Sequence, residues 1–209
     1  VLGVLNGGNA GTLTFNTGNG AVTVTGTVDS ATSVQRQTAI GDGLAGWSST
    51  SQLATGYADW GTILGPFSVG NSITRTLNFA GQAKNITFDF YRLESWDNEY
   101  ARVWVGATNI GQLALAESTS INASTTATSV AAGYGVTFSP SGGVLNGLYN
   151  TTIPGWRDQK LAVSINTPAL SNGSVFKVDS SLDQAWNDEG WGVKNFLVRD
   201  LASSYSGNA

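Results

Sequence analysis

Two segments of this chain combine tryptophan with a short cluster of Asp, Asn and Glu residues: SWDNEYARVWV at 95–105 and AWNDEGWGVKNFLV at 185–198. Carboxylate and amide oxygens are hard ligands, and calcium takes about six to eight of them. Each cluster alone supplies only part of such a shell. We therefore predict that the two clusters meet in the fold and share a calcium ion. The predicted ligands are Asp97, Asn98, Glu99, Asp188 and Glu189.

Acidic residues also gather in turns for a simpler reason, because Asp and Asn side chains hydrogen-bond to their own backbone there. For a single cluster this explanation would suffice. Two clusters weaken it if they lie close together, because like charges repel and gathering them without a cation costs stability. Glu94 precedes the first cluster, and Asp183 and Asn187 accompany the second, so further oxygen ligands are at hand.

The seven tryptophans fall into two groups. Trp buries a large apolar area, so those in or beside the clusters are expected to fill the core or to cover it. These are Trp96, Trp104, Trp186 and Trp191. The remaining three lie in Gly-rich stretches and are predicted to be exposed, as platforms for stacking on sugar rings. They are Trp47, Trp60 and Trp156.

Short alternating runs of apolar and polar residues recur along the chain, separated by Gly, Asn, Ser and Pro, which is typical of β-sandwiches and barrels. The alternation predicts an all-β sandwich. Segment 111–132 is ambiguous, because Ala and Leu could form a short helix in its first part. The expected strands are Thr12–Phe15, Val22–Val28, Ser72–Phe79, Asn85–Tyr91, Ala101–Val105, Gly135–Phe138, Lys160–Asn166, Ser174–Val178 and Val193–Arg199. The expected core residues are Phe88, Phe90, Val103, Val105, Phe196 and Val198.

Composition narrows the class of protein. Only 11% of the 209 residues are charged and the net charge is −4, with polarity supplied by Gly, Ser, Thr and Asn, as is typical of secreted β-proteins. No basic stripe suits nucleic acid, and no apolar run approaches the ~20 residues of a membrane span. The absence of Cys and His excludes disulfides, thiolate metal sites and Ser-His-Asp catalysis. The chain begins at Val1 without Met, from which we expect removal of a secretion signal.

A pair of carboxylates could still hydrolyse glycosides. Asp97 or Glu99, acting with Glu189, would be that pair. Without His the remaining general bases are carboxylates, Lys and Tyr, and no nucleophile-elbow or phosphate-loop motif occurs. We therefore expect that the protein is not an enzyme.

The segments ILGPFSVGNSITRTLNF, ITFDFYRLESWDNEYARVWV and LDQAWNDEGWGVKNFLV resemble a module of secreted and cell-surface proteins of bacteria and ciliates. In that module a strand ending in FDFYxxDSWDNE is paired with a later LDQxxxDESWGI strand. The resemblance runs from about Gly46 to Leu201 and departs from the pattern at Glu94, usually Asp, and at Gly190, usually Ser. It implies an extracellular β-sandwich of jelly-roll type and no known enzyme activity.

Three regions are expected along the chain: an N-terminal β segment at 1–45, the calcium-binding sandwich at 46–201 and a tail at 202–209. The first region is uncharged as far as Val28, and an uncharged edge strand favours pairing with a neighbouring copy, although it could also pair within its own sandwich. We predict an extracellular, calcium-stabilised structural or adhesive surface protein that binds copies of itself or other surface components. The alternative is a carbohydrate-binding module that holds glycans through its loop tryptophans.

Overall fold

The computed structural model describes residues 46–49, 53–57, 60–77, 83–118, 120–146 and 157–200. All of them belong to one compact unit, Gln35–Leu201. Several sequence predictions fall outside these residues and stay predictions. They are the strands Thr12–Phe15 and Val22–Val28, the segment 1–45, the tail 202–209 and the role of Trp156.

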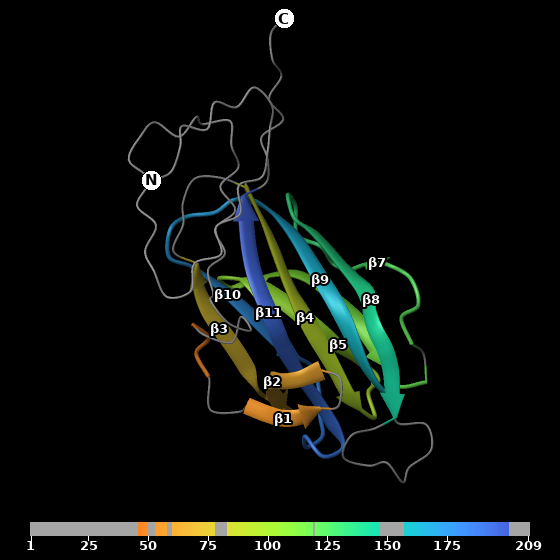
Figure 1. Ribbon diagram of the computed structural model, residues 1–209. Helices are drawn as coiled ribbons and strands as arrows, with labels where there is room; N and C mark the ends of the chain where they lie inside the picture. Colours follow the sequence, from red (N-terminus) through yellow and green to blue (C-terminus); the bar gives the residue numbers. More distant parts are fainter. Residues whose placement is uncertain are drawn as a thin grey trace, which may run out of the picture. The chain divides into compact units, whose positions relative to one another are not determined.

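The described chain forms two antiparallel sheets that pack face to face, which confirms the predicted all-β sandwich (Figure 1). The larger sheet has seven strands in the order β1-β2-β11-β4-β9-β8-β7, and the smaller has four in the order β3-β10-β5-β6. The strands are β1 Leu53–Tyr57, β2 Gly61–Phe67, β3 Ser72–Leu77, β4 Ala83–Glu94, β5 Asp97–Val105, β6 Thr108–Ala116, β7 Thr125–Thr126, β8 Gly135–Asn146, β9 Arg157–Ala169, β10 Ser174–Ser180 and β11 Glu189–Asp200.

The strand order is that of a jelly roll. Strands from the first half of the unit pair in turn with strands from the second half: β2 with β11, β3 with β10 and β4 with β9, while β5 pairs with β6. The chain therefore resembles one long hairpin wrapped into two sheets, with successive pairs in alternate sheets. Strands β1, β7 and β8 extend the larger sheet at its edges. The jelly-roll type expected from the resemblance is confirmed.

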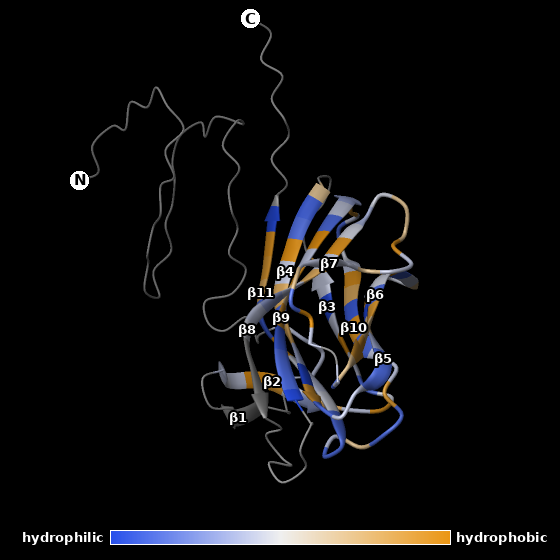
Figure 2. Ribbon diagram, turned by 90° about the vertical axis from the view of Figure 1, so that its right-hand side faces the viewer, coloured by the Kyte–Doolittle hydropathy of each residue, from blue (hydrophilic) through white to orange (hydrophobic). Residues whose placement is uncertain are grey.

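Strand alternation builds the core, because successive side chains point to opposite faces of a sheet. On β4, Phe88 and Phe90 are buried, whereas Asp89 between them is partly exposed. Figure 2 shows the resulting bands of apolar and polar residues along the strands. Five of the six predicted core residues are buried, and the sixth, Val105, packs half-buried against the same cluster, so the predicted core is confirmed.

Six of the predicted strands reach further in the structure than the alternating runs, whereas β3 ends at Leu77 and the last residues of the predicted strand Ser72–Phe79 lie outside the described chain. Strand β5 begins at Asp97 and β11 begins at Glu189, so parts of both acidic clusters lie within strands and not in turns. The extended backbone is held there by ladder hydrogen bonds to the neighbouring strands, which the residue types alone did not indicate. The sheets therefore position the backbone of Asp97, Asn98, Glu99 and Glu189, whereas Asp183, Asn187 and Asp188 stay in the loop before β11.

The helix suggested for the first part of 111–132 is wrong. This stretch completes β6, which pairs with β5 over its length. Two features favour the strand. Leu113 and Leu115 alternate into the core, and a Cβ atom at Gly111 would lie 2.9 Å from Val136 Cγ2 of β8. The Gly thus permits a close approach of the two sheets at this edge.

Several connections cross between the sheets at the same end of the sandwich. The pairing of the strands places the turn 68–71, the loop 181–188, residues 95–96 and the chain after Ala116 side by side at this end. We call these segments the loop end. They are joined by hydrogen bonds, from Val69 N–H to the Gln184 carbonyl at 3.3 Å and from Glu117 N–H to the Trp96 carbonyl at 2.7 Å. None of the described segments forms a helix of the length and hydropathy needed to span a membrane.

Candidate functional site

The loop end brings the two Trp–acid segments into contact. Glu189 on β11 lies opposite Glu94 on β4. The Ser95 backbone N–H donates to the Asp188 carbonyl at 2.9 Å, and the Ser95 hydroxyl donates to Asp188 Oδ1 at 2.7 Å. The buried Trp96 indole donates from Nε1 to the Gly190 carbonyl at 2.7 Å. The segments singled out in the sequence are therefore neighbours in the fold.

Two acids that sequence reasoning missed join them. Asp158 on β9 accepts a hydrogen bond from Glu94 N–H at 2.7 Å, and the charge of Glu117 interacts with Asp97 and Asp188. Of the fourteen acidic residues in the chain, eight thus gather at the loop end. They are Glu94, Asp97, Glu99, Glu117, Asp158, Asp183, Asp188 and Glu189. We call this set the acidic end.

One buried arginine partly balances the acidic end. The guanidinium of Arg92 donates to the carbonyl of Ala116 and, at 2.9 Å, to that of Arg157. Burial lowers the pKa of Arg92 to about 10, while the nearby carboxylates of Asp158 and Glu117 oppose this shift. Arg157 lies close enough to act on the same group. Among the described residues, two arginines thus stand beside the eight acids of this end.

Glu189 is the most constrained member of the acidic end. Its side chain is 0% exposed. Its Oε2 accepts long hydrogen bonds from the backbone N–H groups of Asp183, at 3.4 Å, and Gln184, at 3.3 Å, whereas the buried Oε1 has no hydrogen-bond partner. Burial raises the pKa of Glu189 to about 7, with a further contribution from the charge of Glu99. A buried acceptor without a donor normally has a ligand or water to satisfy it.

Glu117, which follows β6 at the loop end, resembles Glu189 in having an unsatisfied carboxylate oxygen and a raised pKa. Its Oε2 is also buried without a hydrogen-bond partner. Burial raises the pKa of Glu117, the charge of Asp97 raises it further, and Arg92 acts in the opposite direction. Asp188 adds a smaller contribution that also raises it. Both oxygens therefore belong to carboxylates that lie close to other acids, and at Glu117 the charge of Arg92 offsets part of this.

The five predicted calcium ligands stand at different depths. Asp97 and Asn98 are exposed, and Glu99 is half-buried and accepts a hydrogen bond from Asp97 N–H. Asp188 is half-buried and Glu189 fully buried. Asn98 has a left-handed backbone, with φ of 85°.

Among the residues described, no three acidic side chains converge closely enough to form a metal cage by themselves. Calcium also takes backbone carbonyls and water as ligands, so a cage of side chains is not required. Glu189 and Glu117 each have a buried carboxylate oxygen without a hydrogen-bond partner among the described residues, so both are candidates to contact an ion. A shared ion thus stays a prediction.

The prediction of exposed loop tryptophans is wrong for two of the three. Trp47 is only 6% exposed and packs edge-on against Phe196, with ring centroids 5.0 Å apart. Trp60 is 9% exposed and packs against Tyr91 at 5.0 Å. The reason is that glycine-rich flanks let the backbone fold back and bury a large apolar ring, which outweighs the apparent loop position. These rings offer no free face to a sugar.

The tryptophans of the two clusters differ from one another. Trp96 and Trp191 are buried, as predicted, and Phe90 packs on both rings. Trp104 is half-buried on the outer face of the smaller sheet. Trp186 is 46% exposed, so it does not fill the core, and the expectation that it covers the core stays a prediction. It lies in a turn of the loop that connects β10 to β11. Its side chain is therefore not directed toward the core by strand alternation.

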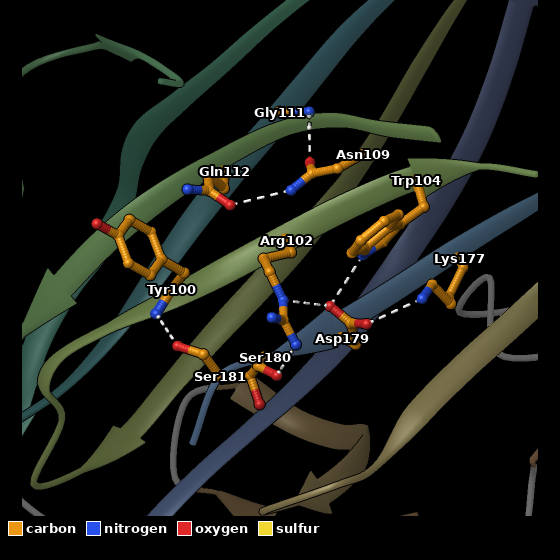
Figure 3. A network of polar contacts seen from close by, with 10 residues as sticks. All are labelled: Tyr100, Arg102, Trp104, Asn109, Gly111, Gln112, Lys177, Asp179, Ser180 and Ser181. Carbon is orange, nitrogen blue, oxygen red and sulfur yellow. Dashed lines mark hydrogen bonds and ion pairs between the residues drawn. The ribbon is translucent and has the colours of Figure 1, made fainter. Parts of the chain in front are cut away.

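A second polar network lies on the outer face of the smaller sheet (Figure 3). Asp179 on β10 accepts from Arg102 Nε at 2.7 Å and from Trp104 Nε1 at 2.9 Å, and its Oδ2 pairs with Lys177 Nζ at 3.0 Å. The Lys177 ammonium also sits 3.9 Å from the centre of the Trp104 ring. Here one carboxylate has donors on both oxygens, two from the neighbouring strand β5 and one from its own strand β10.

No family model, curated protein or solved structure matches this chain. The resemblance of its two motifs to the surface module stays a prediction.

Proposed function

We propose that this protein is a non-catalytic extracellular module of the structural or adhesive kind, stabilised by a calcium ion at the acidic end. One observation carries the proposal: Glu189 is fully buried, and within the part of the chain that the structure describes its Oε1 has no hydrogen-bond donor, while Glu99 and Asp183 add negative charge beside it. An ionised carboxylate in such a place is costly unless a cation neutralises it. A divalent ion would supply the missing charge and the missing partner together.

The chemistry of the donors favours calcium over other cations. Carboxylate oxygens and the carbonyls of the 181–188 loop are hard ligands, and the chain has no Cys or His to select zinc or copper. Calcium accepts irregular shells of six to eight oxygens, whereas magnesium demands a near-ideal octahedron. Glu189 and Glu99 would hold the ion, with Asp183 beside them. The bound ion would fasten the 181–188 loop to the start of β5.

The burial of Glu189 argues against the hypothesis that the protein hydrolyses glycosides. A carboxyl group with a raised pKa close to a second carboxylate is the arrangement of a general acid and its partner. A general acid must come within hydrogen-bond reach of the glycosidic oxygen. The Glu189 side chain is closed off from solvent by the strands and loops around it. The same shift in pKa is therefore better explained as the mark of an incomplete ion site.

The surface role depends on composition and on the motif resemblance. Low charge with abundant Thr, Asn and Gly suits secreted β-sandwiches, and the resembling module occurs on cell surfaces.

We also propose, as a more specific part of this function, that the protein assembles with copies of itself through residues 1–28. Size-exclusion chromatography of the chain with and without residues 1–28 tests it, and association that survives the deletion would contradict it.

Calcium-dependent thermal unfolding tests the proposed ion. We expect calcium to stabilise the protein by about 2.7 kcal/mol at 100-fold saturation relative to chelator. Glu189→Gln and Glu99→Gln should each lose most of that response. Asp89→Asn is the matched control, because Asp89 is already paired with Lys160 at 3.1 Å and with Asn195 at 2.7 Å on the larger sheet. Melting curves of the unaltered protein that coincide in calcium and in chelator would overturn the proposal.

A further inference from the structure

The exposed apolar side chains of the sandwich gather at the loop end. Four large apolar residues in the described chain are more than a third exposed: Val69 48%, Tyr100 38%, Val175 38% and Trp186 46%. Val175 lies near the start of β10, away from the loop end. The other three are on or against the loop 181–188. Such grouping marks an interaction site, because scattered apolar residues are normal on a surface but clustered ones are not.

Backbone hydrogen bonds fix these three residues to the same loop. Trp186 belongs to the loop itself. The Val69 N–H donates to the Gln184 carbonyl at 3.3 Å. Tyr100 N–H donates to the Ser181 hydroxyl at 2.7 Å, and Ser181 N–H donates to the Tyr100 carbonyl at 3.0 Å (Figure 3). The order β3-β10-β5 explains the grouping, since it places the turn before β3 and the start of β5 on either side of the loop that leaves β10.

Polar side chains accompany Trp186 in the same loop. Asp183 and Asn187 are exposed in the loop, and Gln184 is half-buried beside them. Their oxygens accept hydrogen bonds and the amides also donate them. An aromatic ring beside carboxylate and amide groups matches a ligand that has one apolar C–H face and a rim of hydroxyls. A sugar ring has this combination.

We propose that Tyr100, Asp183, Trp186 and Asn187 form a binding surface for a neutral glycan. The rings of Trp186 and Tyr100 stack on pyranose faces, and Asp183 with Asn187 accepts from and donates to the hydroxyls. The ligand is neutral because the acidic end beside it repels anionic sugars. The inference rests on the proposed adhesive function, since it names the ligand class through which adhesion would act. It replaces the buried Trp47 and Trp60 with a different pair of aromatics.

Binding of the full chain to an array of neutral oligosaccharides, covering glucans, galactans, mannans and xylans, tests this surface in calcium buffer. We expect retention of at least one class. Trp186→Ala should weaken it by about tenfold and Tyr100→Ala by a smaller factor. Val175→Ala, equally exposed but distant, is the matched control and should bind as the unaltered protein does. Both aromatic variants remove exposed side chains, so their melting temperatures should stay close to the original.

The experiment distinguishes failure of the proposed glycan surface from failure of the proposed calcium site. No retained oligosaccharide, or equal retention by Trp186→Ala, would overturn the glycan surface, and capture of a protein in place of a glycan would do the same. Trp186→Ala should keep the full thermal response to calcium. If sugar binding fails while that response persists, only the present inference is lost. If sugar binding depends on Trp186 while calcium has no thermal effect, the ion proposal fails and the surface stands.

Discussion

Asp179 and Glu189 are both buried carboxylates on neighbouring parts of the same sandwich, yet their surroundings differ in kind. Asp179 receives Arg102 and Trp104 from the adjacent strand β5 and Lys177 from its own strand β10. Glu189 receives only two long backbone bonds on one oxygen and none on the other. The first carboxylate is satisfied by the protein alone. The second has one buried oxygen without a donor among the described residues, which is where the proposed ion would bind.

The difference follows from where each residue stands in the fold. On a sheet face, cross-strand neighbours are fixed by the register, so opposite charges can be placed beside one another: Arg102 lies directly across from Asp179. At the loop end four connections of unrelated sequence converge, and acids come from two of them, 181–188 and the chain after Ala116, and from the strand ends beside them. A cluster of like charges that persists at a fixed point of the fold is a sign of function more than of stability.

The largest effect should come from removing the residue that joins the two Trp–acid segments. Trp96→Ala deletes a fully buried ring and its bond to the Gly190 carbonyl, which should cost about 3–5 kcal/mol and abolish the calcium response. Trp104→Ala removes a half-buried ring from the Asp179 network and should cost about 1–2 kcal/mol with the calcium response intact. Urea unfolding with and without calcium measures both. Equal losses from the two variants would contradict the comparison.

The next effect concerns pH. A carboxyl group whose pKa is raised by folding binds its proton more tightly in the folded state, so the unfolding free energy falls as pH rises from its ordinary value to its folded value. For Glu189 that window runs from 4.5 to about 7, and the raised pKa of Glu117 acts in the same direction. In chelator, acidification from about pH 8 to about pH 5 should therefore stabilise the protein by about 1–3 kcal/mol.

Calcium and mutation should both change this pH trend. Glu189→Gln is neutral at every pH and should flatten most of it. Saturating calcium should reverse its sign above pH 5, because the ion competes with the proton for the same carboxylate. Thermal melts across this pH range in chelator and in calcium provide the measurement. A stability that is flat with pH in chelator for the unaltered protein would contradict the assignment of Glu189.

Alternation along the chain was enough to predict the sandwich and most of its core. Phe88, Phe90 and Phe196 face inward because period-two patterns leave little choice of face. The composition of the two clusters was enough to single out the segments that meet. Asp158 was missed because it has no local signal: its place depends on the pairing of β4 with β9, which no short stretch of sequence contains.

Glu117 carried a signal that could have been read. It follows Leu113 and Leu115, whose alternation continues the strand toward the acidic end. The exposure of tryptophan could not be derived from loop composition. Trp47 looked exposed because glycine surrounds it, and Trp186 looked buried because it stands beside a strand-like run. Whether a loop ring finds a core depends on tertiary neighbours such as Phe196, which lie far away in the sequence.

The smallest effect is a difference in the sign of the change in unfolding free energy when Asp179 and Glu189 are each replaced by their amides. Asp179→Asn keeps the shape of the side chain but removes its charge, and its new amide group would face Lys177 Nζ, donor against donor. Because Arg102 and Lys177 remain partly open to water, the loss should be only about 1 kcal/mol, the same in calcium and in chelator.

Glu189→Gln should instead stabilise the protein in chelator at pH 8, since it removes a buried charge that has no partner. Urea unfolding measures the unfolding free energy of each variant in calcium and in chelator. If Asp179→Asn gained a calcium dependence, or Glu189→Gln destabilised the protein in chelator, then the contrast between the two carboxylates would be wrong.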